Sequence, residues 1–355
     1  MRRKAGRVNG QPPGDLPLSG VARNLDVRVC LGYFGSVSKL LIGLLSVLIS
    51  TNQQAAPSNV VEKTSTISAE IPDPKDPVEK EYLQLLAQDN GSQAEVDKWI
   101  QESQGATNFA AATLPLRINQ RFESVKKNYE DFLQRNPKHV RAHLAYGSFL
   151  NEIRDEEEGV KHWEKARELD SRNPAAWNNL ANYYGHRSPV KKAFEYYAKA
   201  IEIDPNEPVY YQNFATTVYL FRKDAMEFYN INETEVFDKA LDLYRKAMKL
   251  APTDFILASD YAQSFYGTKP PRMQDGLVAW TDAMKIARDD IEREGVRIHL
   301  ARINWKLNHF EDARRQLAAV TNVMYATTKK KLLQNVEESE SNAKQTNAVP
   351  SAAKE

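Results

Sequence analysis

The feature that most constrains the fold of this 355-residue chain is a self-similarity that returns every 34 residues. Pairs of like residues share this one offset: Trp163 and Tyr197, Ala166 and Ala200, Leu169 and Ile203, Pro174 and Pro208, Trp177 and Tyr211, Asn179 and Asn213, and Leu180 and Phe214. A repeat of this length is typical of a supersecondary unit that buries its apolar face against copies of itself. The period therefore predicts a stacked array and not one globular core.

The order of small and large residues within one repeat indicates how the unit packs. The unit that starts at Pro174 places alanines and bulky residues at regular intervals and ends near a proline: Trp177, Leu180, Ala181, Tyr184, Ala193, Tyr197, Ala200 and Pro205. Small residues let two helices approach closely, and large ones fill the space toward the next unit. This pattern resembles the tetratricopeptide repeat (TPR) family. The resemblance implies an all-α fold: a TPR-type α-solenoid, a right-handed superhelix of antiparallel helix pairs, with N-terminal helices and a disordered tail.

The resemblance extends with lower fidelity over about residues 121–320. Further units start at Val140, Pro208 and Phe255, and a degenerate fifth unit lies around Leu300. In the Pro208 unit the second helix arrives 13 residues late, because an insertion at about 221–232 lies in the turn between its helices.

The insertion has two interpretations. Its Phe228 and Tyr229 either form a contact patch or, as we prefer, extend the helices and pack on neighbours. The sequence leaves both interpretations open.

The segments around the array divide the chain further. The predicted parts are a basic unstructured N-terminus (1–28), a signal peptide or signal anchor (29–56), a linker (57–76), an N-terminal helical region (77–120), a TPR array with terminal capping helices (121–337) and a disordered tail (338–355). Asp76 followed by Pro77 predicts the start of a first helix, which Asn90-Gly91 ends, and Ser92 caps a second. A break over 104–115 is expected before a third helix over 116–134.

The N-terminal segment predicts export. A basic flank, the apolar run 40–49 and a polar small-residue stretch follow the order of a secretory signal. Ten helical residues span about 15 Å, half of a hydrocarbon core of about 30 Å. Extending the run to Val29 gives a spanning length but places Lys39 near mid-membrane, at a cost of about 3 kcal/mol.

A cleaved signal is therefore slightly favoured over an anchor. Both predict an exported (periplasmic or extracytoplasmic) body, membrane-anchored by residues 29–49 in the second case. The alternative, in which 40–49 is a buried core helix, predicts a cytoplasmic protein.

Composition and motifs exclude several function classes. The 48 Lys+Arg against 47 Asp+Glu leave little net charge, which argues against a nucleic-acid partner. The single cysteine, Cys30, cannot form an internal disulfide or a thiolate zinc site. No nucleotide-binding, zinc-protease or serine-hydrolase motif occurs, and His143 falls on a packing position. We therefore expect no enzyme activity, no cofactor, no metal and no small-molecule substrate.

What remains is the concave face that the TPR resemblance implies. The first-helix positions that face this groove in the family give the predicted peptide-binding residues Asn178, Asn179, Asn182, Gln212, Asn213, Tyr219, Asp260 and Gln263. A carboxamide carries both a donor and an acceptor, so it can pair with a peptide backbone whatever the side chains. Each such bond contributes about 1 kcal/mol, which predicts weak, sequence-tolerant binding. The alternative, that Trp-Asn-Asn-Leu is only a common sequence in this family, stays open.

Two functional hypotheses follow. The first is a non-catalytic TPR scaffold, exported to the cell envelope, that binds a protein or peptide partner through the concave groove. The second is a structural subunit of an envelope assembly that binds through its convex face or its N-terminal helices.

Overall fold

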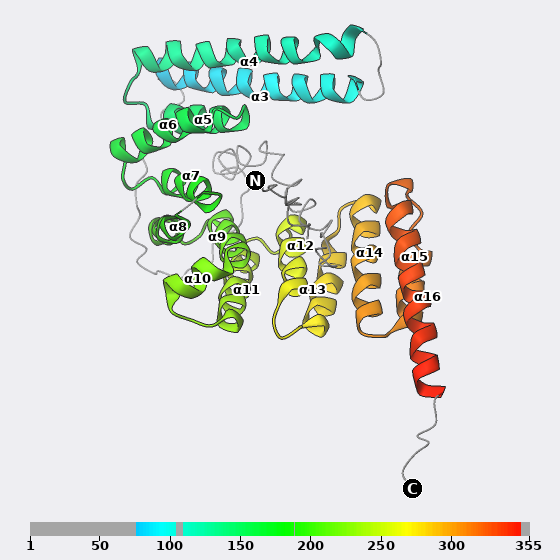
Figure 1. Cartoon of the computed structure of the whole chain (residues 1–355). Coiled ribbons are helices and arrows are strands. Elements are labelled where there is room, and N and C mark those ends of the chain that lie inside the picture. The colour runs from blue at the N-terminus through cyan, green and yellow to red at the C-terminus, as the bar shows by residue number, and fades with distance from the viewer. Residues whose placement is uncertain (1–75, 104–108, 188, 349–355) are drawn as a thin grey trace, which may run out of the picture. The chain divides into compact units, whose positions relative to one another are not determined.

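The computed structural model describes residues 76–103, 109–187 and 189–348 (Figure 1). Over these ranges the regular structure consists of helices, without a strand, which confirms the all-α class. None of the helices in these ranges is both long enough and apolar enough to span a bilayer. The predicted N-terminus, the predicted signal or anchor and residues 57–75 of the linker lie outside the described residues.

The helices in the described part of the chain follow one another through short turns. Their bounds are α3 (Pro77–Ser103), α4 (Phe109–Arg135), α5 (Val140–Glu152), α6 (Glu156–Leu169), α7 (Pro174–Gly185), α8 (Lys191–Ile203), α9 (Pro208–Leu220), α10 (Arg222–Tyr229), α11 (Glu233–Leu250), α12 (Phe255–Ser264), α13 (Met273–Ile286), α14 (Asp290–Lys306), α15 (Phe310–Ala318) and α16 (Ala326–Ala348), with short 3₁₀ helices at Phe265–Gly267 and Val323–Tyr325.

The array is built from helical hairpins, each of which packs on the next (Figure 1). The hairpins are α5/α6, α7/α8, α9/α11, α12/α13 and α14/α15, and contacts between α6 and α7, α8 and α9, α11 and α12, and α13 and α14 join them. The first helices also touch in turn, α5 with α7, α7 with α9 and α9 with α12. This stacking of paired helices confirms the predicted TPR-type solenoid.

Small residues set the distance between the two helices of a hairpin. In the central unit Ala181, Ala193 and Ala200 are fully buried, as the repeat pattern predicts. In the preceding unit α5 and α6 meet at two glycines. A Cβ on Gly147 would lie 2.6 Å from the Trp163 ring, and a Cβ on Gly159 would lie 2.8 Å from the Gly147 carbonyl oxygen. The backbones approach so closely that no side chain fits between them.

Local capping explains where the first helices begin. The Asn173 side chain accepts hydrogen bonds from the first backbone N–H groups of α7, and Pro174 occupies its first turn. Asp254 caps α12 in the same way. Asx caps satisfy donors that no helical carbonyl can reach, so they end the preceding turn and start the helix.

The N-terminal hairpin differs from the sequence prediction. Asn90-Gly91 does not end a helix, because α3 continues from Pro77 to Ser103. The Ser92 hydroxyl donates to the Asp89 carbonyl 2.7 Å away, inside the same helix, and does not cap a new one. Packing of α3 along α4 outweighs the roughly 1 kcal/mol helix penalty of one glycine.

The next helix also starts earlier than expected. The predicted break over 104–115 was wrong from residue 109 onward, since α4 begins at Phe109 and includes Pro115. Pro115 is the seventh residue of α4, so it lies inside the helix and removes one backbone hydrogen bond, which the remaining length of the helix tolerates.

The insertion at 221–232 forms the short helix α10. Phe228 and Tyr229 pack against Phe194 of α8, with ring centroids 5.4 and 5.7 Å away. The preferred interpretation, packing on neighbours, is confirmed.

The last helix closes the array. α16 packs on α14 and α15 and buries Leu332 and Val336. Trp305 of α14 donates through its indole N–H to the Ser339 hydroxyl at 2.8 Å, and Arg314 of α15 pairs with Glu340 at 2.7 Å. These contacts extend helical structure to Ala348, well into the segment 338–355 that was expected to be disordered.

Candidate functional site

The predicted peptide-binding residues lie on three first helices that contact one another in sequence. Asn178, Asn179 and Asn182 belong to α7, Gln212, Asn213 and Tyr219 to α9, and Asp260 and Gln263 to α12. We call these eight residues the amide face.

One cluster of the amide face joins α7 to α9. The Asn213 amide N–H donates to the Asn178 side-chain oxygen at 3.1 Å, and the Asn178 amide lies 3.5 Å from the oxygen of Asn179. Asn178 is 1% exposed and Asn179 is 6% exposed. At this burial an amide must find partners within the protein, so this cluster acts first as a clamp between successive repeats.

A second cluster joins α9 to α12. The Gln212 amide donates to an Asp260 carboxylate oxygen at 2.8 Å. Burial raises the pKa of Asp260 to about 6, the nearby Asp254 carboxylate acts in the same direction, and the Gln212 hydrogen bond opposes both. The structure thus links Asn178 to Asn213 and Gln212 to Asp260 across successive repeats.

The other predicted residues are integrated into hairpin packing. The Asn182 oxygen accepts a hydrogen bond from the Tyr197 hydroxyl of α8 at 2.7 Å. The Tyr219 ring lies 5.8 Å from that of Phe237, and a Cβ on Gly267 would lie 2.2 Å from the Tyr219 hydroxyl. Gln263 is half-buried on α12.

The amide face keeps some capacity for a ligand. A carboxamide offers two N–H donors and an oxygen with two lone pairs, and each bond described above uses one of these groups. Asn182, Gln212 and Asn213 are half-buried, so a chain that lies along the first helices can reach them. The clamp and a peptide contact are therefore compatible in the same side chains.

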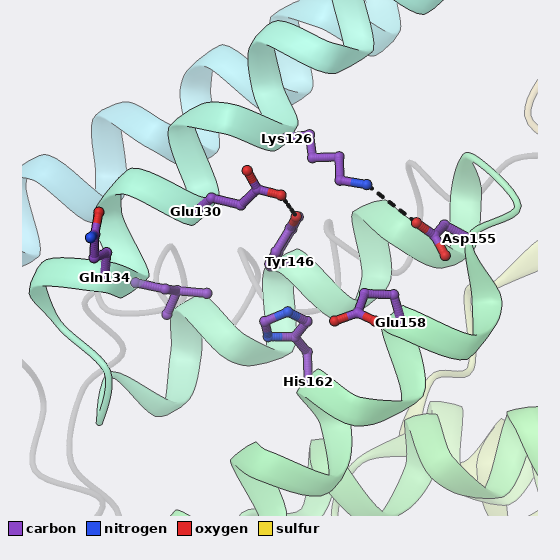
Figure 2. A pocket seen from close by; sticks show the side chains of 8 residues that line it. Lys126, Glu130, Gln134, Tyr146, Asp155, Glu158 and His162 are labelled. Atoms are coloured by element: carbon purple, nitrogen blue, oxygen red, sulfur yellow. Dashed lines mark hydrogen bonds and ion pairs between the residues drawn. The ribbon is translucent and has the colours of Figure 1, made fainter.

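A cavity of about 450 Å³ lies where α4, α5 and α6 meet (Figure 2). Helix α4 contributes Lys126, Glu130, Leu133 and Gln134, helix α5 contributes Tyr146, and the start and first turns of α6 contribute Asp155, Glu158 and His162. Sequence reasoning missed this site, because its lining residues come from three helices. A signal existed in Glu158 and His162, whose i, i+4 spacing places them on one face of a helix.

Two other histidines stabilise the fold. His139 and His143 are four residues apart, a spacing that can hold a metal, but each forms hydrogen bonds with other groups of the protein. His139 caps α5 and lies 3.2 Å from Glu79, while His143 contacts the Pro137 carbonyl oxygen at 3.1 Å. Over the described ranges no group of three or more His, Cys, Asp or Glu side chains is arranged to hold a metal ion.

Two carboxyl groups lie where α3 meets the array, the buried Asp89 and the half-buried Glu152. Asp89 of α3 is 1% exposed and accepts a hydrogen bond from the Tyr129 hydroxyl at 2.7 Å. Burial raises the pKa of Glu152 of α5 to about 8, and the charge of Asp89 adds to the effect. The Glu152 Oε1 atom is buried without a hydrogen-bond partner among the described residues.

The repeats and their clamps define a class of protein: a helical repeat array whose hairpins stack in register. Residues 111–176 match the family model of the TPR repeats of TmcB, and residues 152–208 match a tetratricopeptide repeat model. These matches over residues 111–208, together with the hairpin architecture, identify tetratricopeptide repeats in this chain.

Individual proteins show more distant similarity. A photosystem I assembly protein, Ycf3 of Rippkaea orientalis, is 27% identical over 84 residues, which are 23% of this chain and 49% of that protein. The chain thus spans about half the length of this curated relative. The crystal structure of PilW, a type IV pilus biogenesis factor, is 13% identical and matches 68% of this chain and 98% of its own, with a TM-score of 0.49. The crystal structure of YrrB, a TPR protein with an unusual peptide-binding site, is 13% identical in sequence. It matches 61% of this chain and 97% of its own, with a TM-score of 0.42.

Proposed function

We propose that this protein is an exported, non-catalytic scaffold that binds a protein or peptide partner in an extended conformation along the amide face. The observation that carries the proposal is the run of half-buried carboxamides on successive first helices, Asn182, Gln212 and Asn213, each with hydrogen-bonding groups left for a ligand. These groups recognise a backbone and not particular side chains. The relative named as an assembly protein is in keeping with such a role.

Export in this proposal rests on the sequence of residues 29–56. A basic flank followed by an apolar run predicts translocation of everything after it. Cell fractionation with N-terminal sequencing of the mature protein tests it. A mature N-terminus after residue 50 in an extracytoplasmic fraction supports a cleaved signal, and an intact N-terminus in the membrane fraction supports the anchor. A cytoplasmic chain with its first residues intact contradicts export.

The binding proposal is tested by a pull-down from envelope extract with the double variant Asn182→Ala and Asn213→Ala. We expect recovery of the partner to fall at least five-fold, since two of about three backbone bonds of roughly 1 kcal/mol each are lost. The matched control is Asn304→Ala, which removes a 6% exposed amide on α14, outside the amide face, where it donates to the Leu300 carbonyl. Equal recovery from the double variant and the wild type would contradict the proposal.

A second candidate function uses the N-terminal hairpin. Leu83 and Ile100 of α3 and Leu116 of α4 are large apolar side chains that are 40%, 41% and 60% exposed. Such residues favour a structural subunit that docks through α3 and α4. Crosslinks from residues 77–135 to a partner, with none from α7, α9 and α12, would favour this function over the first.

A further inference from the structure

The cavity between α4, α5 and α6 lies outside the amide face and presents a different chemistry (Figure 2). Its polar lining consists mainly of hydrogen-bond acceptors. Glu130 and Gln134 extend from α4, and Glu158 extends from the first turns of α6. The Tyr146 hydroxyl donates to Glu130 at 3.1 Å, which fixes that carboxylate at the cavity wall.

Two histidine contacts leave the Nε2 atom of His162 as a further hydrogen-bond acceptor at the cavity. The Nε2 atom of His143 lies 3.1 Å from the Pro137 carbonyl oxygen, an acceptor, so Nε2 carries the proton and Nδ1 of His143 is left as an acceptor. The Nδ1 atom of His162 lies 2.8 Å from this atom and must donate to it. The proton of a neutral His162 is thereby assigned to Nδ1, and its Nε2 is a lone pair on a ring that lines the cavity.

His162 stays neutral at the pH of most cells. Burial and the adjacent His143 lower the pKa of His162 to about 4. The imidazole therefore offers an acceptor and no positive charge near pH 7.

The charge of the cavity is negative even after its internal pairs are counted. Lys126 pairs with Asp155 at 3.4 Å, and the exposed Lys161 pairs with Glu158 at the rim. Glu130 makes no ion pair within the described ranges. One carboxylate charge is therefore not neutralised by a neighbouring cation, beside a wall of neutral acceptors.

We propose that this cavity binds the guanidinium group of an arginine side chain presented by a protein partner. A guanidinium carries five N–H donors in a planar fork and no acceptor, which complements Glu130, Glu158, Gln134 and the Nε2 atom of His162. Leu133, which is 7% exposed, offers an apolar wall for the methylene stem. A phosphate or carboxylate ligand would meet carboxylates, and a lysine ammonium would leave acceptors unused.

The site adds partner chemistry to the proposed scaffold without depending on the amide face. It predicts a partner with an arginine that contacts α4 and α6, while backbone contacts with α7, α9 and α12 tolerate any sequence. The two sites can be tested separately because no residue belongs to both.

The test uses the full chain with ¹³C-labelled histidine, followed by NMR at pH 7. The probe is N-acetyl-arginine amide, and N-acetyl-citrulline amide is the matched uncharged probe of the same length. We expect a saturable shift of the His162 ring resonance, assigned with the variant His162→Gln, for arginine and at least ten-fold weaker binding for citrulline. Glu130→Gln with Glu158→Gln should weaken arginine binding at least ten-fold.

The control variant is Glu157→Gln, an exposed carboxylate on the same helix that does not line the cavity. It should bind the arginine probe like the wild type, and thermal melting should show that all variants fold. The proposal is overturned if citrulline binds as well as arginine, if the His162 resonance shows no saturable shift at millimolar arginine, or if inorganic phosphate or a divalent cation produces the saturable shift instead.

Discussion

Trp177 and Tyr211 lie one repeat apart and make the same bond to the same place in the turn before them. The indole N–H of Trp177 donates to the Ser171 carbonyl at 2.9 Å, and the hydroxyl of Tyr211 donates to the Pro205 carbonyl at 3.1 Å. Donors and acceptors are both 34 residues apart. Two rings of different chemistry therefore fix the turn to the first helix in successive units.

This bond should be measurable in Tyr211→Phe. The ring remains in place, 9% exposed in the wild type, but the donor to the Pro205 carbonyl is lost. We expect the free energy of unfolding to fall by about 1 kcal/mol, which is a drop of roughly 2–4 °C in Tm for a domain of this size. Tyr183→Phe serves as control, since that ring packs edge-on against Tyr184. A loss of the same size in both variants would show that the turn bond contributes nothing specific.

Two glycines in helices should respond oppositely to alanine. At Gly147 an added Cβ would lie 2.6 Å from Trp163 and 2.8 Å from the Gly159 carbonyl, so Gly147→Ala must push α5 and α6 apart. We expect destabilisation of about 1–3 kcal/mol. At Gly91 nothing lies within 4 Å of the added Cβ, so Gly91→Ala should stabilise α3 by about 0.5–1 kcal/mol. Thermal melting of both variants is the measurement, and melting temperatures that shift in the same direction would refute the packing argument.

The clamp between repeats predicts a cost for Asn178→Ala. The substitution leaves the Asn213 amide without its acceptor 3.1 Å away, and a polar group left unpaired in a buried environment costs about 1–3 kcal/mol. Asn206→Ala, in an exposed turn, should change stability by less than about 0.5 kcal/mol. Urea unfolding followed by circular dichroism compares them. A neutral Asn178→Ala would mean that water or another side chain replaces the bond.

We expect the free energy of unfolding to depend on pH through the ionisation of Glu152. Its pKa rises to about 8 in the folded chain from an ordinary value of 4.5, so the folded state holds a proton that the unfolded state releases. This contribution is complete below pH 4.5 and is lost as pH rises through 8, with a slope of at most about 1.4 kcal/mol per pH unit. The half-buried His162 and His299, whose pKa values are lowered to about 4 and about 3, act in the opposite direction only below pH 6.5.

The comparison of wild type with Glu152→Gln isolates this group. The glutamine keeps the size of the side chain and cannot ionise, so its melting temperature should fall less between pH 6.5 and 8.5 than that of the wild type. The other carboxylates that face the site, Asp89 and Asp97 of α3, are unchanged in both proteins. Parallel melting curves across this range would show that Glu152 ionises normally.

Much of the array could be predicted from the sequence because its signals are local. Ala193 and Ala200 are buried at helix contacts, as the repeat pattern predicts, and Asn173 caps α7. Phe228 and Tyr229 of the insertion pack on Phe194 of α8. The N-terminal hairpin could not be predicted, since Asn90-Gly91 is a stop signal that only the contact with α4 overrules.

The contacts within the site were harder to predict from the sequence than the fold, for a physical reason. Periodicity placed Asn178 and Gln212 on first helices but could not show that Asn213 and Asp260 would be their partners, because those distances depend on how one repeat stacks on the next. The cavity was beyond reach, since Glu130, Tyr146 and His162 come from three helices and meet only after folding.

Helix α16 has a consequence for growth of the array. Each hairpin of a solenoid has an apolar side on which the next hairpin packs. In this chain the apolar side of the last hairpin is covered by Leu332 and Val336 of α16. The Trp305–Ser339 and Arg314–Glu340 hydrogen bonds hold α16 on α14 and α15. The apolar side of the last hairpin is therefore covered by the chain's own helix and is not open for a further hairpin to stack on it.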